Sequence, residues 1–579
     1  MGPNIRLGED PSALPTEWRA QAEPHIIRSP ANPNLLVATF QEGRFVDGGA
    51  VDCGYSISND GGLTWSRSLI PHLSNRLDDG AFDRVSDPVA AIDLNGVIYL
   101  NTLGVTGTPA QFRSSILLSR STDTGMTLSA PNIIAASLST TNFLDKNWVA
   151  INTFERTRTA NRIAVAFTYP TATRLSVGMF AQPIVSTYSD DGGQTWSPLR
   201  FVSSPACIGA QPIFLPDGAL AIIYWSFVNE NGTSFEDRIE VALSADGGGT
   251  FDSPRLVARP AWHDDPIARD GFNLPSVATD HRAGVLYATY QGRSRSTPRI
   301  FFTKSIDRGQ TWSAPVAVSD TPLSRSVFNA AIAVSPDGQH VSIIFYDKRN
   351  DDGSGNWVDL YLAESFDGGD TWQPNLQLSE VSSDLRRAPL TDRGRMLGDY
   401  QAIAADVDFE TPAVACWIDT RTGSPDPFAV RIGRPQGTTF ETWRQLRFSP
   451  DKLADAGISG PTADADHDGI PNLAEYVFAL EPGQADEPAV VLDLSAAGGE
   501  DPLITFRYAR LRTLADVALS WEASPDLAAW QAARPITEQT AKSVDPLLEN
   551  VTLTFRRSER VAEFFRLVIS PNPALGSRF

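Results

Sequence analysis

Cysteine, methionine and long apolar runs are scarce in this chain of 579 residues. It holds 3 cysteines (Cys53, Cys207 and Cys416) and 4 methionines. Because the cysteines are far apart and odd in number, they cannot build a disulfide framework, and no two are spaced as a metal-binding pair. No apolar run approaches the roughly 18 residues that a membrane-spanning helix needs, so we expect no membrane insertion.

Positive charge is also in short supply. Lys and Arg number 48 against 69 Asp and Glu, which gives a net charge of −21. This imbalance excludes the basic surface typical of nucleic-acid-binding proteins, so we expect no nucleic-acid partner. Hydrophobic residues make up 42% of the chain, enough for a large core, and 41 prolines favour turn-rich β structure over helical bundles. We expect a monomer.

What the chain does contain is a repeated eight-residue motif. Its copies are SNDGGLTW (58–65), STDTGMTL (121–128), SDDGGQTW (189–196), SADGGGTF (244–251), SIDRGQTW (305–312) and SFDGGDTW (365–372). Near-copies spaced roughly 60 residues apart indicate stacked or radially arranged structural units.

The motif has a simple physical interpretation. Its Asp can accept hydrogen bonds from the amides of its own turn, the Gly two residues later suits a positive φ, and the Trp can pack between sheets. Two strand-like runs precede each motif, as at 331–346 before the motif at 365–372. A third run ends in the motif and a fourth follows it, as 299–305 and 314–319 do around the motif at 305–312. Four antiparallel strands per unit predict the blade of a β-propeller, in which the Asp of each motif is structural.

On these residues the chain resembles the Asp-box, or bacterial neuraminidase repeat, proteins of the sialidase superfamily. The resemblance implies an all-β fold with a β-propeller at residues 18–448, a linker at 449–485 and a C-terminal module at 486–579. A seventh unit without the motif is visible at residues 400–434, so seven blades are favoured, and the six blades of sialidases proper are the alternative. We expect the N-terminal segment to complete the last blade.

The predicted linker contains a loop with calcium-binding spacing, DADHDGIPNLAE at residues 464–475. It alternates acidic residues, allows a sharp turn at Gly469 and ends in a Glu that can chelate through both oxygens, as EF-hand loops do. The candidate ligands are Asp464, Asp466, Asp468, the Ile470 carbonyl, Asn472 and Glu475. We expect one structural Ca²⁺ ion here, and an acidic turn without metal is the alternative.

The last part of the chain, residues 489–570, alternates apolar and polar positions and predicts a small antiparallel β-sandwich. It would serve as a spacer, sorting or stability module, or alternatively bind carbohydrate. The chain opens with Met1-Gly2-Pro3, without the charged and apolar regions of a secretory signal. We expect that such a signal has been removed and that the protein is secreted or lies at the cell surface.

Four equivalent strand ends carry an acidic or amide residue two positions before an arginine. These are Glu42 with Arg44, Gln291 with Arg293, Asp347 with Arg349 and Asp419 with Arg421. A planar guanidinium binds a carboxylate bidentately, so arginines that converge on the propeller axis would hold an acidic sugar. The alternative is that each arginine pairs with the acid of its own blade and stabilises the sheet.

The resemblance to sialidases also implies catalytic roles. Arg44 would belong to the arginine triad that binds the sugar carboxylate, and Asp47 would be the proton donor. Arg28 resembles the arginine of the family's Arg-Ile-Pro motif. Tyr400 opens the last unit and would be the nucleophile, with Asp399 beside it as its polarising group. A substrate-contacting or structural Tyr400 is the alternative.

Further candidates lie just before or between the predicted innermost strands. They are Arg84, Asp87, Asp145, Lys146, the possible sugar contact Trp148, and His263 with Asp264 and Asp265. Two positions depart from the sialidase pattern: Glu23 precedes Pro24 where the family has its arginine motif, and Asn273 stands where it has the glutamate partner of its tyrosine.

The sequence therefore predicts a secreted glycoside hydrolase acting on acidic, sialic or uronic, glycans. One alternative is a polysaccharide lyase, in which His263 or Tyr400 is the base and arginine neutralises the uronic carboxylate. The other is a glycan-binding or adhesion protein without catalysis. No Ser-His-Asp set, phosphate loop or metalloprotease motif is visible in the sequence.

Overall fold

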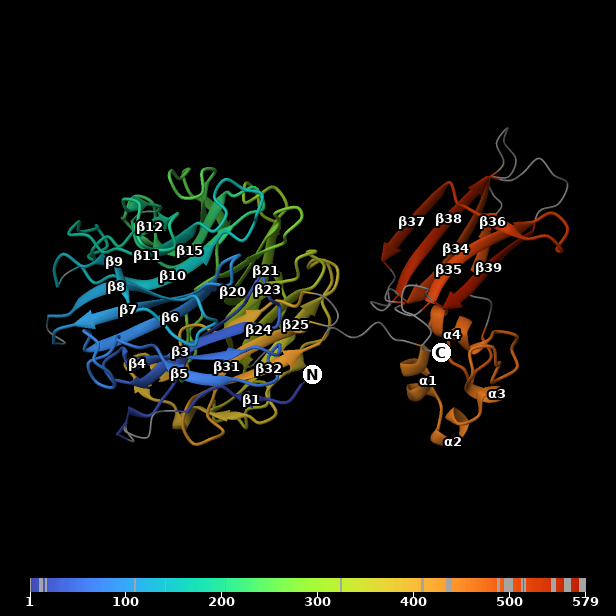
Figure 1. The fold of residues 1–579 in the computed structure, drawn as a ribbon, viewed down its shortest axis with the longest axis horizontal. Helices are drawn as coiled ribbons and strands as arrows, with labels where there is room; N and C mark the ends of the chain where they lie inside the picture. Colours follow the sequence, from blue (N-terminus) through green and yellow to red (C-terminus); the bar gives the residue numbers. More distant parts are fainter. Residues whose placement is uncertain are drawn as a thin grey trace. The chain divides into compact units, whose positions relative to one another are not determined.

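The computed structural model of the protein is drawn in Figure 1. It describes residues 2–9, 14–15, 18–108, 111–140, 142–203, 205–322, 325–407, 411–433, 440–486, 490–493, 503–511, 514, 517–542, 548–556 and 564–571. The chain divides into two compact units, Met1–Gly433 and Arg434–Phe579, here called the N-terminal body and the C-terminal body.

In the described part of the N-terminal body, most strands fall into seven antiparallel groups of four, here called sheets I to VII, and pairing of Ala50 with Val85 joins sheets I and II into one eight-stranded sheet. Sheet I holds β2 (Ala22–Arg28), β3 (Leu36–Arg44), β4 (Ala50–Ser58) and β5 (Ser66–Leu69). Sheet II holds β6 (Arg84–Ile92), β7 (Ile98–Thr106), β8 (Arg113–Ser121) and β9 (Asn132–Ala136). Sheet III holds β10 (Asp145–Ile151), β11 (Ile163–Thr168), β12 (Ile184–Ser189) and β13 (Arg200–Phe201). Sheet IV holds β14 (Cys207–Phe214), β15 (Leu220–Val228), β16 (Phe235–Ser244) and β17 (Arg255–Ala258).

The remaining sheets follow the same plan. Sheet V holds β19 (Ser276–Thr279), β20 (Leu286–Ser294), β21 (Thr297–Ser305) and β22 (Val316–Ala317). Sheet VI holds β23 (Val327–Val334), β24 (Val341–Asp347), β25 (Trp357–Ser365) and β26 (Leu376–Gln377), and β27 (Ser383–Asp384) also pairs with β25. Sheet VII holds β30 (Ala402–Ala404), β31 (Ala413–Asp419), β32 (Asp426–Ile432) and, from the start of the chain, β1 (Ile5–Arg6).

The seven sheets close into a ring. Their innermost strands β2, β6, β10, β14, β19, β23 and β30 contact one another in that order, and β2 also contacts β30. The ring is completed by β1, whose Ile5 pairs with Ala429 of β32, and Figure 1 shows the N-terminus beside this strand. The N-terminal segment therefore completes the last sheet as expected, and this body begins before residue 18.

Apolar residues between neighbouring sheets hold the ring together. One cluster joins sheets I and II through Tyr55 and Leu100, and another joins sheets V and VI through Phe302 and Ile343. The Trp that ends a motif packs against such a cluster, for example Trp372 against that of sheets V and VI. This placement confirms the sequence-based interpretation of the motif tryptophans.

Each repeated motif forms the same turn. In the first copy, Asp60 Oδ1 accepts hydrogen bonds from the amides of Leu63 at 3.0 Å and Thr64 at 2.9 Å. The Ser58 hydroxyl donates to the same oxygen at 2.8 Å and accepts from the Gly62 amide. Gly62 has a φ of 91°, which favours glycine. The Asp of the motif therefore fixes its own turn, as the pattern predicted.

A small additional sheet ties together two segments that are far apart in the sequence. Strand β18 (Ala268–Arg269) lies between sheets IV and V, whereas β28 (Leu390–Thr391) and β29 (Gly394–Met396) lie between sheets VI and VII. A short 3₁₀ helix, η2 (Leu385–Arg387), precedes β28. Parallel pairing of β18 with β29 brings these two connections side by side.

The C-terminal body combines short helices with two antiparallel sheets. The helices are α1 (Phe440–Arg447), α2 (Pro450–Leu453), α3 (Ala456–Ser459) and α4 (Asn472–Phe478). One sheet has the order β33 (Val490–Asp493), β34 (Leu503–Leu511), β38 (Leu548–Arg556), β37 (Thr537–Lys542), and the other β36 (Gln531–Ala533), β35 (Val517–Ser524), β39 (Phe564–Pro571). Phe506 of the first sheet packs on Trp521 of the second, with ring centroids 4.5 Å apart.

Helix α1 belongs to the C-terminal body, because its Phe440 and Trp443 pack on Tyr476 of α4. The N-terminal body therefore ends before the predicted residue 448.

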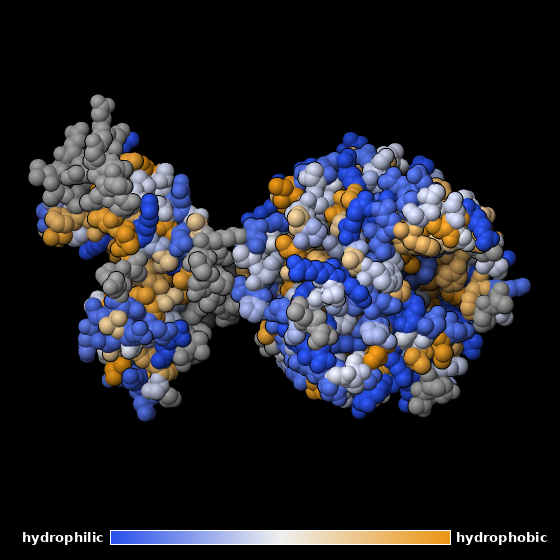
Figure 2. Space-filling view, turned by 180° about the vertical axis from the view of Figure 1, so that it is seen from behind, coloured by the Kyte–Doolittle hydropathy of each residue, from blue (hydrophilic) through white to orange (hydrophobic). Residues whose placement is uncertain are grey.

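No helix in the described ranges is long and apolar enough to span a membrane. Hydrophilic side chains cover most of the face shown in Figure 2, in keeping with the net charge of −21.

Candidate functional site

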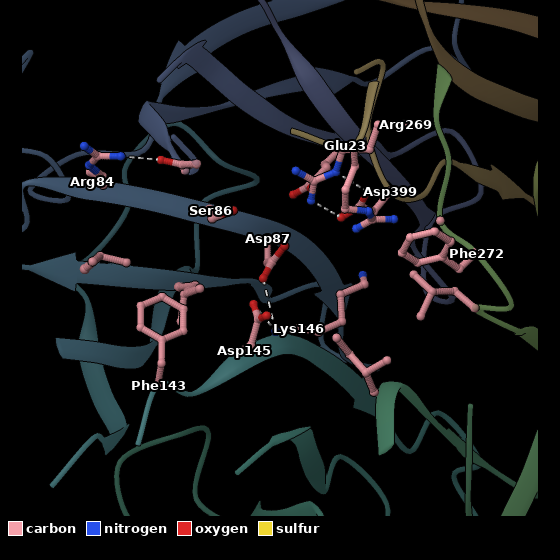
Figure 3. Close-up of a pocket in the computed structure, with 18 of the residues that line it drawn as sticks. Glu23, Arg84, Ser86, Asp87, Phe143, Asp145, Lys146, Arg269, Phe272 and Asp399 are labelled. Atoms are coloured by element: carbon pink, nitrogen blue, oxygen red, sulfur yellow. Dashed lines mark hydrogen bonds and ion pairs between the residues drawn. The ribbon is translucent and has the colours of Figure 1, made fainter. Parts of the chain in front are cut away.

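The N-terminal body contains a cavity of about 420 Å³ at one end of the ring of innermost strands, here called the axial pocket. Figure 3 shows its charged side chains converging from several sheets. Those that line it are Glu23, Arg44, Asp47, Arg84, Asp87, Asp145, Lys146, Arg269, Arg393 and Asp399. Cationic and acidic groups are thus concentrated in one cavity.

Irregularities at equivalent positions of the innermost strands place several of these residues. The register of β2, β6 and β10 shifts next to Glu23, Asp87 and Lys146 respectively. These three residues have φ values of 53°, 48° and 53°, in the left-handed region that non-glycine residues rarely adopt. A β-bulge re-aims a side chain, and here it lies where the strands meet the axial pocket. Asn329 of β23 has the same conformation, with a φ of 52°.

The cationic side of the pocket depends on the small additional sheet. Arg269 of β18 donates to both carboxylate oxygens of Asp399, from Nε at 2.9 Å and from Nη2 at 2.7 Å. Arg393, next to β29, donates to the Asp270 carbonyl, and its guanidinium lies 3.5 Å from the centre of the Phe272 ring. The pairing of β18 with β29 therefore brings two arginines to the cavity.

Arg44 reaches the pocket from the end of β3, where the sequence pattern predicted it. Its Nη1 donates to Gln41 Oε1 at 2.7 Å, while its Nε has no hydrogen-bond partner among the described residues. The acid of its own pattern, Glu42, instead accepts from Arg67 Nε at 3.0 Å. Because Arg67 is the ion-pair partner of Glu42, the Arg44 guanidinium does not pair with this acid and lines the pocket instead.

Lys146 is a buried cation of the pocket whose ammonium is not hydrogen-bonded within the described part of the chain. The residue is 6% exposed, and its Nζ lies 3.6 Å from the centre of the Tyr400 ring. Burying an ammonium without a hydrogen-bond partner is costly, so its retention points to a ligand that supplies the missing acceptors.

The acidic groups of the pocket have opposed protonation preferences. Burial and the nearby Asp87 and Asp399 raise the pKa of Glu23 well above its ordinary value. Burial also raises the pKa of Asp145 to about 6 and, together with Asp145, that of Asp87. Burial acts in the same direction on Asp399, but Arg269 outweighs it and lowers the pKa of this carboxyl. The pocket thus holds carboxyl groups whose pKa is raised beside one whose pKa is lowered.

Asp87 and Asp145 approach each other at the backbone amide of Lys146. This amide donates to Asp87 Oδ2 at 3.2 Å and to Asp145 Oδ1 at 3.0 Å, as the dashed lines of Figure 3 mark. Gln41 Nε2 donates to Glu23 Oε2 at 2.7 Å and so orients this third carboxyl group. These groups form one electrostatically coupled cluster.

Asp47, the predicted proton donor, lies at the rim of the pocket. It is paired with Arg84, whose Nη1 and Nη2 lie 2.6 Å and 3.1 Å from its carboxylate oxygens. The hydrogen bond from Arg84 lowers the pKa of Asp47, so this carboxyl is ionised at neutral pH. Its environment does not favour the role of acid that the resemblance implied.

Tyr400, the predicted nucleophile, lies outside the lining of the axial pocket. It is 7% exposed, and its hydroxyl has no hydrogen-bond partner in the described ranges. Burial raises the pKa of its phenol further above the ordinary value, and the neighbouring Asp399 is bound to Arg269 instead. A tyrosinate needs a carboxylate within hydrogen-bond reach, so the geometry does not support nucleophilic attack by Tyr400.

Trp148 also lies behind the pocket wall. It makes edge contacts with Tyr400 at 5.4 Å and with His25 at 5.2 Å between ring centroids. These three aromatic residues therefore form one contact cluster, His25 on β2, Trp148 on β10 and Tyr400 just before β30. Their contacts support a structural role for Trp148 in place of the predicted sugar contact.

The structure does not bring the other predicted arginines to the pocket. Arg349 pairs with Asp347 at 2.7 Å, and Arg421 pairs with Asp419 at 2.7 Å. These pairs correspond to the sheet-stabilising alternative for the pattern. Arg293, at the end of β20, is exposed and does not line the cavity.

Arg28 has a structural role at the junction of sheets I and VII. Its guanidinium donates to the carbonyls of Ala405 at 3.1 Å and Pro412 at 2.6 Å. His263 bonds to Ser326 Oγ at 2.8 Å, and burial lowers its pKa to about 4. Asp265 pairs with Lys348 at 2.6 Å. None of these residues lines the axial pocket.

Sequence reasoning missed three central residues, Glu23, Arg269 and Arg393. Glu23 was noted only because it replaces an expected arginine motif, although Glu23-Pro24 matches Asp87-Pro88 at the equivalent place of the next sheet. That shared acid-proline pair was a usable signal. Arg269 and Arg393 lie on connections outside the repeat, and no local pattern distinguishes them.

A second cluster of acidic groups lies in the C-terminal body. Carboxylate oxygens of Asp464, Asp466 and Asp468 all lie within 4.8 Å of one another. Glu475 of α4 is fully buried, and neither of its carboxylate oxygens has a hydrogen-bond partner in the described part of the chain. Burial and the three aspartates raise the pKa of Glu475 to about 8. A buried carboxylate without donors requires a cation or a proton.

Comparison with known proteins gives limited information. The family model of the BNR/Asp-box repeat matches residues 187–198, which contain the third copy of the motif. A search of curated proteins found no match.

A search of solved structures found several that are similar to part of this chain. An α-L-arabinofuranosidase of Fusarium graminearum with arabinobiose is 14% identical, with a TM-score of 0.41, over 59% of this chain and 92% of that one. A Hadza microbial sialidase is 16% identical, with a TM-score of 0.40, over 68% and 76%. An ulvan lyase of a new polysaccharide lyase family is 13% identical, with a TM-score of 0.45, over 74% and 96%. Because these values are low, the similarities identify no substrate or reaction for this chain.

Proposed function

We propose that the N-terminal body is a seven-bladed, sialidase-like β-propeller that binds an acidic glycan in the axial pocket and hydrolyses a glycosidic bond. The observation that carries the proposal is the convergence of Arg44, Lys146, Arg269 and Arg393 with carboxyl groups of opposed pKa in one cavity. The closed contacts of the innermost strands support the blade count.

Recognition of the substrate follows from the cations. The Arg44 Nε, the Arg393 Nε and the Lys146 ammonium have no hydrogen-bond partner in the described ranges, so these groups have donors to spare. A sugar carboxylate would supply the acceptors they lack, through charge-assisted hydrogen bonds that are stronger than neutral ones. The hydroxyls of an uncharged sugar could accept hydrogen bonds but would not offset the charge of the buried ammonium, so an acidic sugar, sialic or uronic, is the preferred ligand.

Catalysis follows from the carboxyl groups. Two carboxyl groups whose environments push their pKa values apart divide the roles of acid and base in glycoside hydrolysis. Glu23, with its raised pKa, is the candidate proton donor to the leaving oxygen. Asp399, held ionised by Arg269, stabilises positive charge at the sugar or activates water.

The test is an activity panel of fluorogenic sialosides and uronides on wild type, Glu23→Gln and Arg349→Ala. Glu23→Gln should lower kcat by roughly 10²–10⁴-fold, as expected for loss of a general acid. Arg349→Ala removes an ion pair outside the pocket and serves as the control, because loss of a charge that only stabilises a sheet should leave kcat unchanged. Turnover of no substrate together with binding of acidic sugars would favour a glycan-binding protein instead.

A lyase is the second candidate, because the Tyr400 hydroxyl has no hydrogen-bond partner in the described ranges and the Lys146 ammonium of the pocket lies 3.6 Å from the centre of its ring. As the base, Tyr400 would have to reach the substrate from behind the pocket lining. Elimination from a uronic residue removes the proton next to the carboxylate and expels the glycosidic oxygen. The product carries a new C=C bond that absorbs ultraviolet light, whereas hydrolysis adds water. Ultraviolet absorbance of the product, lost in Tyr400→Phe, would identify the lyase.

We also assign one Ca²⁺ to the loop at residues 464–475, and we regard the two sheets that follow it as a β-sandwich module. The loop oxygens cluster, Gly469 turns with a φ of 93°, and the buried carboxylate of Glu475 has no hydrogen-bond partner among the described residues. Asp464, Asp466, Asp468 and Glu475 would hold the ion, together with the Ile470 carbonyl, and Asn472 has an unsatisfied Oδ1 there. Extracellular calcium levels suit such loops, in agreement with secretion.

Calcium titration tests this assignment. Saturating Ca²⁺ at about 100 times its Kd should stabilise the C-terminal body by about 2.7 kcal/mol. The Glu475→Gln variant should lose this stabilisation, whereas Glu481→Gln, on the exposed surface, should keep it. Equal responses of the two variants would contradict the assignment.

A further inference from the structure

An aromatic wall adjoins the cationic side of the axial pocket. It consists of Trp225, Phe227, Trp262 and Phe272, and three of these residues line the cavity directly. The ring centroids of Trp262 and Phe272 are 4.7 Å apart, and those of Trp225 and Trp262 are 5.7 Å apart. The rings therefore form one continuous apolar surface.

The wall is fixed in place by polar contacts at its edges. Trp225 Nε1 donates to Asp237 Oδ1 at 2.9 Å, and the Phe272 amide donates to Asp270 Oδ1 at 2.9 Å. Arg393, which lines the pocket, lies over the Phe272 ring at 3.5 Å. The cationic groups and the aromatic wall thus meet at this arginine, and the two surfaces are continuous.

Trp262 extends the wall beyond the cavity. Its side chain is 42% exposed although it contacts two other aromatic rings. An acidic monosaccharide would be satisfied by the cations and would leave this indole in water. The C–H face of a sugar ring is apolar and packs on aromatic rings, so a second ring of the same glycan would cover Trp262.

We infer that the aromatic wall is a sugar-stacking subsite, and that the ligand of the axial pocket is an acidic oligosaccharide or polysaccharide in which a further sugar ring adjoins the acidic residue. This inference rests on the proposed function, because the acidic residue must occupy the cationic side. It adds that binding depends on chain length.

Calorimetric titration of the full chain compares two ligands, methyl glucuronide and a trisaccharide with glucuronate between neutral sugars. Trp262→Ala should lower the affinity for the trisaccharide about tenfold and leave that for the methyl glucuronide unchanged. Trp262→Phe should retain most of the trisaccharide affinity, because it keeps an aromatic face. Trp530→Ala, in the C-terminal body, is the control for removal of an indole elsewhere.

The outcomes separate this inference from the proposed function. Equal wild-type affinities for both ligands, or no effect of Trp262→Ala, would overturn the sugar-stacking subsite. If the methyl glucuronide still binds in that case, the acidic-sugar site of the proposed function stands. Trisaccharide binding that depends on Trp262 but not on Lys146, tested with Lys146→Met, would support the subsite and reject the acidic site. Binding of neither ligand would overturn both.

Discussion

Two positions recur around the ring of the N-terminal body, and they use polar side chains in opposite ways. In the repeated turns, Asp60 and its equivalents are half-buried or exposed and accept several hydrogen bonds each. At the bulges of the innermost strands, Glu23, Asp87 and Lys146 are buried, and the Lys146 ammonium has no hydrogen-bond partner among the described residues. The turns keep the same residues in every copy, whereas the bulges place different residues in the same geometry. The repeated residues of the turns therefore stabilise the fold, whereas the different residues at the equivalent bulges form the axial pocket.

The two positions also differ in energy. A turn Asp stabilises its surroundings, since each hydrogen bond to a charged acceptor contributes about 1.5–3 kcal/mol at most and less when exposed. A non-glycine residue in the left-handed region costs of order 1–3 kcal/mol at a functional site. Strain at the bulges is tolerated because the apolar clusters between sheets hold the strands on both sides.

The largest effect is expected at a bulge. Lys146→Met should lower the affinity for an acidic sugar at least tenfold, because a charge-assisted hydrogen bond is lost. Loss of the ammonium should also raise the pKa of Glu23 further, since Lys146 now lowers it. The pH dependence of binding measured by calorimetry checks both results, and an unchanged affinity would remove Lys146 from the site.

An intermediate effect of the opposite kind is expected at a turn. Asp60→Ala should lower the melting temperature by a few degrees and leave kcat unchanged, while Asp60→Asn, which keeps one acceptor, should be milder. Burial opposes ionisation, but hydrogen bonds from Thr64, Ser58 and Leu63 together outweigh it and lower the pKa of Asp60 from 3.8 to about 2. This contribution is therefore present above pH 3.8 and is lost as the pH falls through 2. A loss of kcat in Asp60→Ala would break the distinction between turns and bulges.

The smallest effect is expected at a third kind of buried group, one that is fully partnered. His340 bonds to Asp406 at 3.0 Å and to Glu364 at 3.1 Å, and it stacks on Phe366. Burial opposes its charge, but these two carboxylates raise the pKa of His340 from 6.5 to about 9. Its stabilisation is present below pH 6.5 and is lost as the pH rises through 9.

Urea unfolding between pH 6 and 10 tests this link between sheets VI and VII. Wild type should lose stability over this range more steeply than His340→Gln, which cannot be charged. Equal slopes would show that His340 is neutral in the folded protein and that its carboxylate partners are not both ionised.

Local patterns were sufficient for the features that repeat. The Asp-box turns, the four strands per sheet and the packing of the tryptophans follow from residues close in sequence, because a turn is built from its own amides. The same local reasoning located Arg44 at the end of a second strand, and Asp87 and Lys146 near innermost strands. It could not tell Arg44 from Arg349 and Arg421, since all three follow an acid by two positions but only beside Arg44 does Arg67 occupy that acid.

The sequence by itself determined the all-β character, the repeat and the spacing of the acidic loop at residues 464–475, because each depends on residues within one turn or strand. The tertiary structure alone decided which charges meet. Arg269 and Asp399 are 130 positions apart and come together because β18 pairs with β29. The pKa of each pocket carboxyl depends on burial and on neighbours from other sheets, and neither can be read from a local pattern.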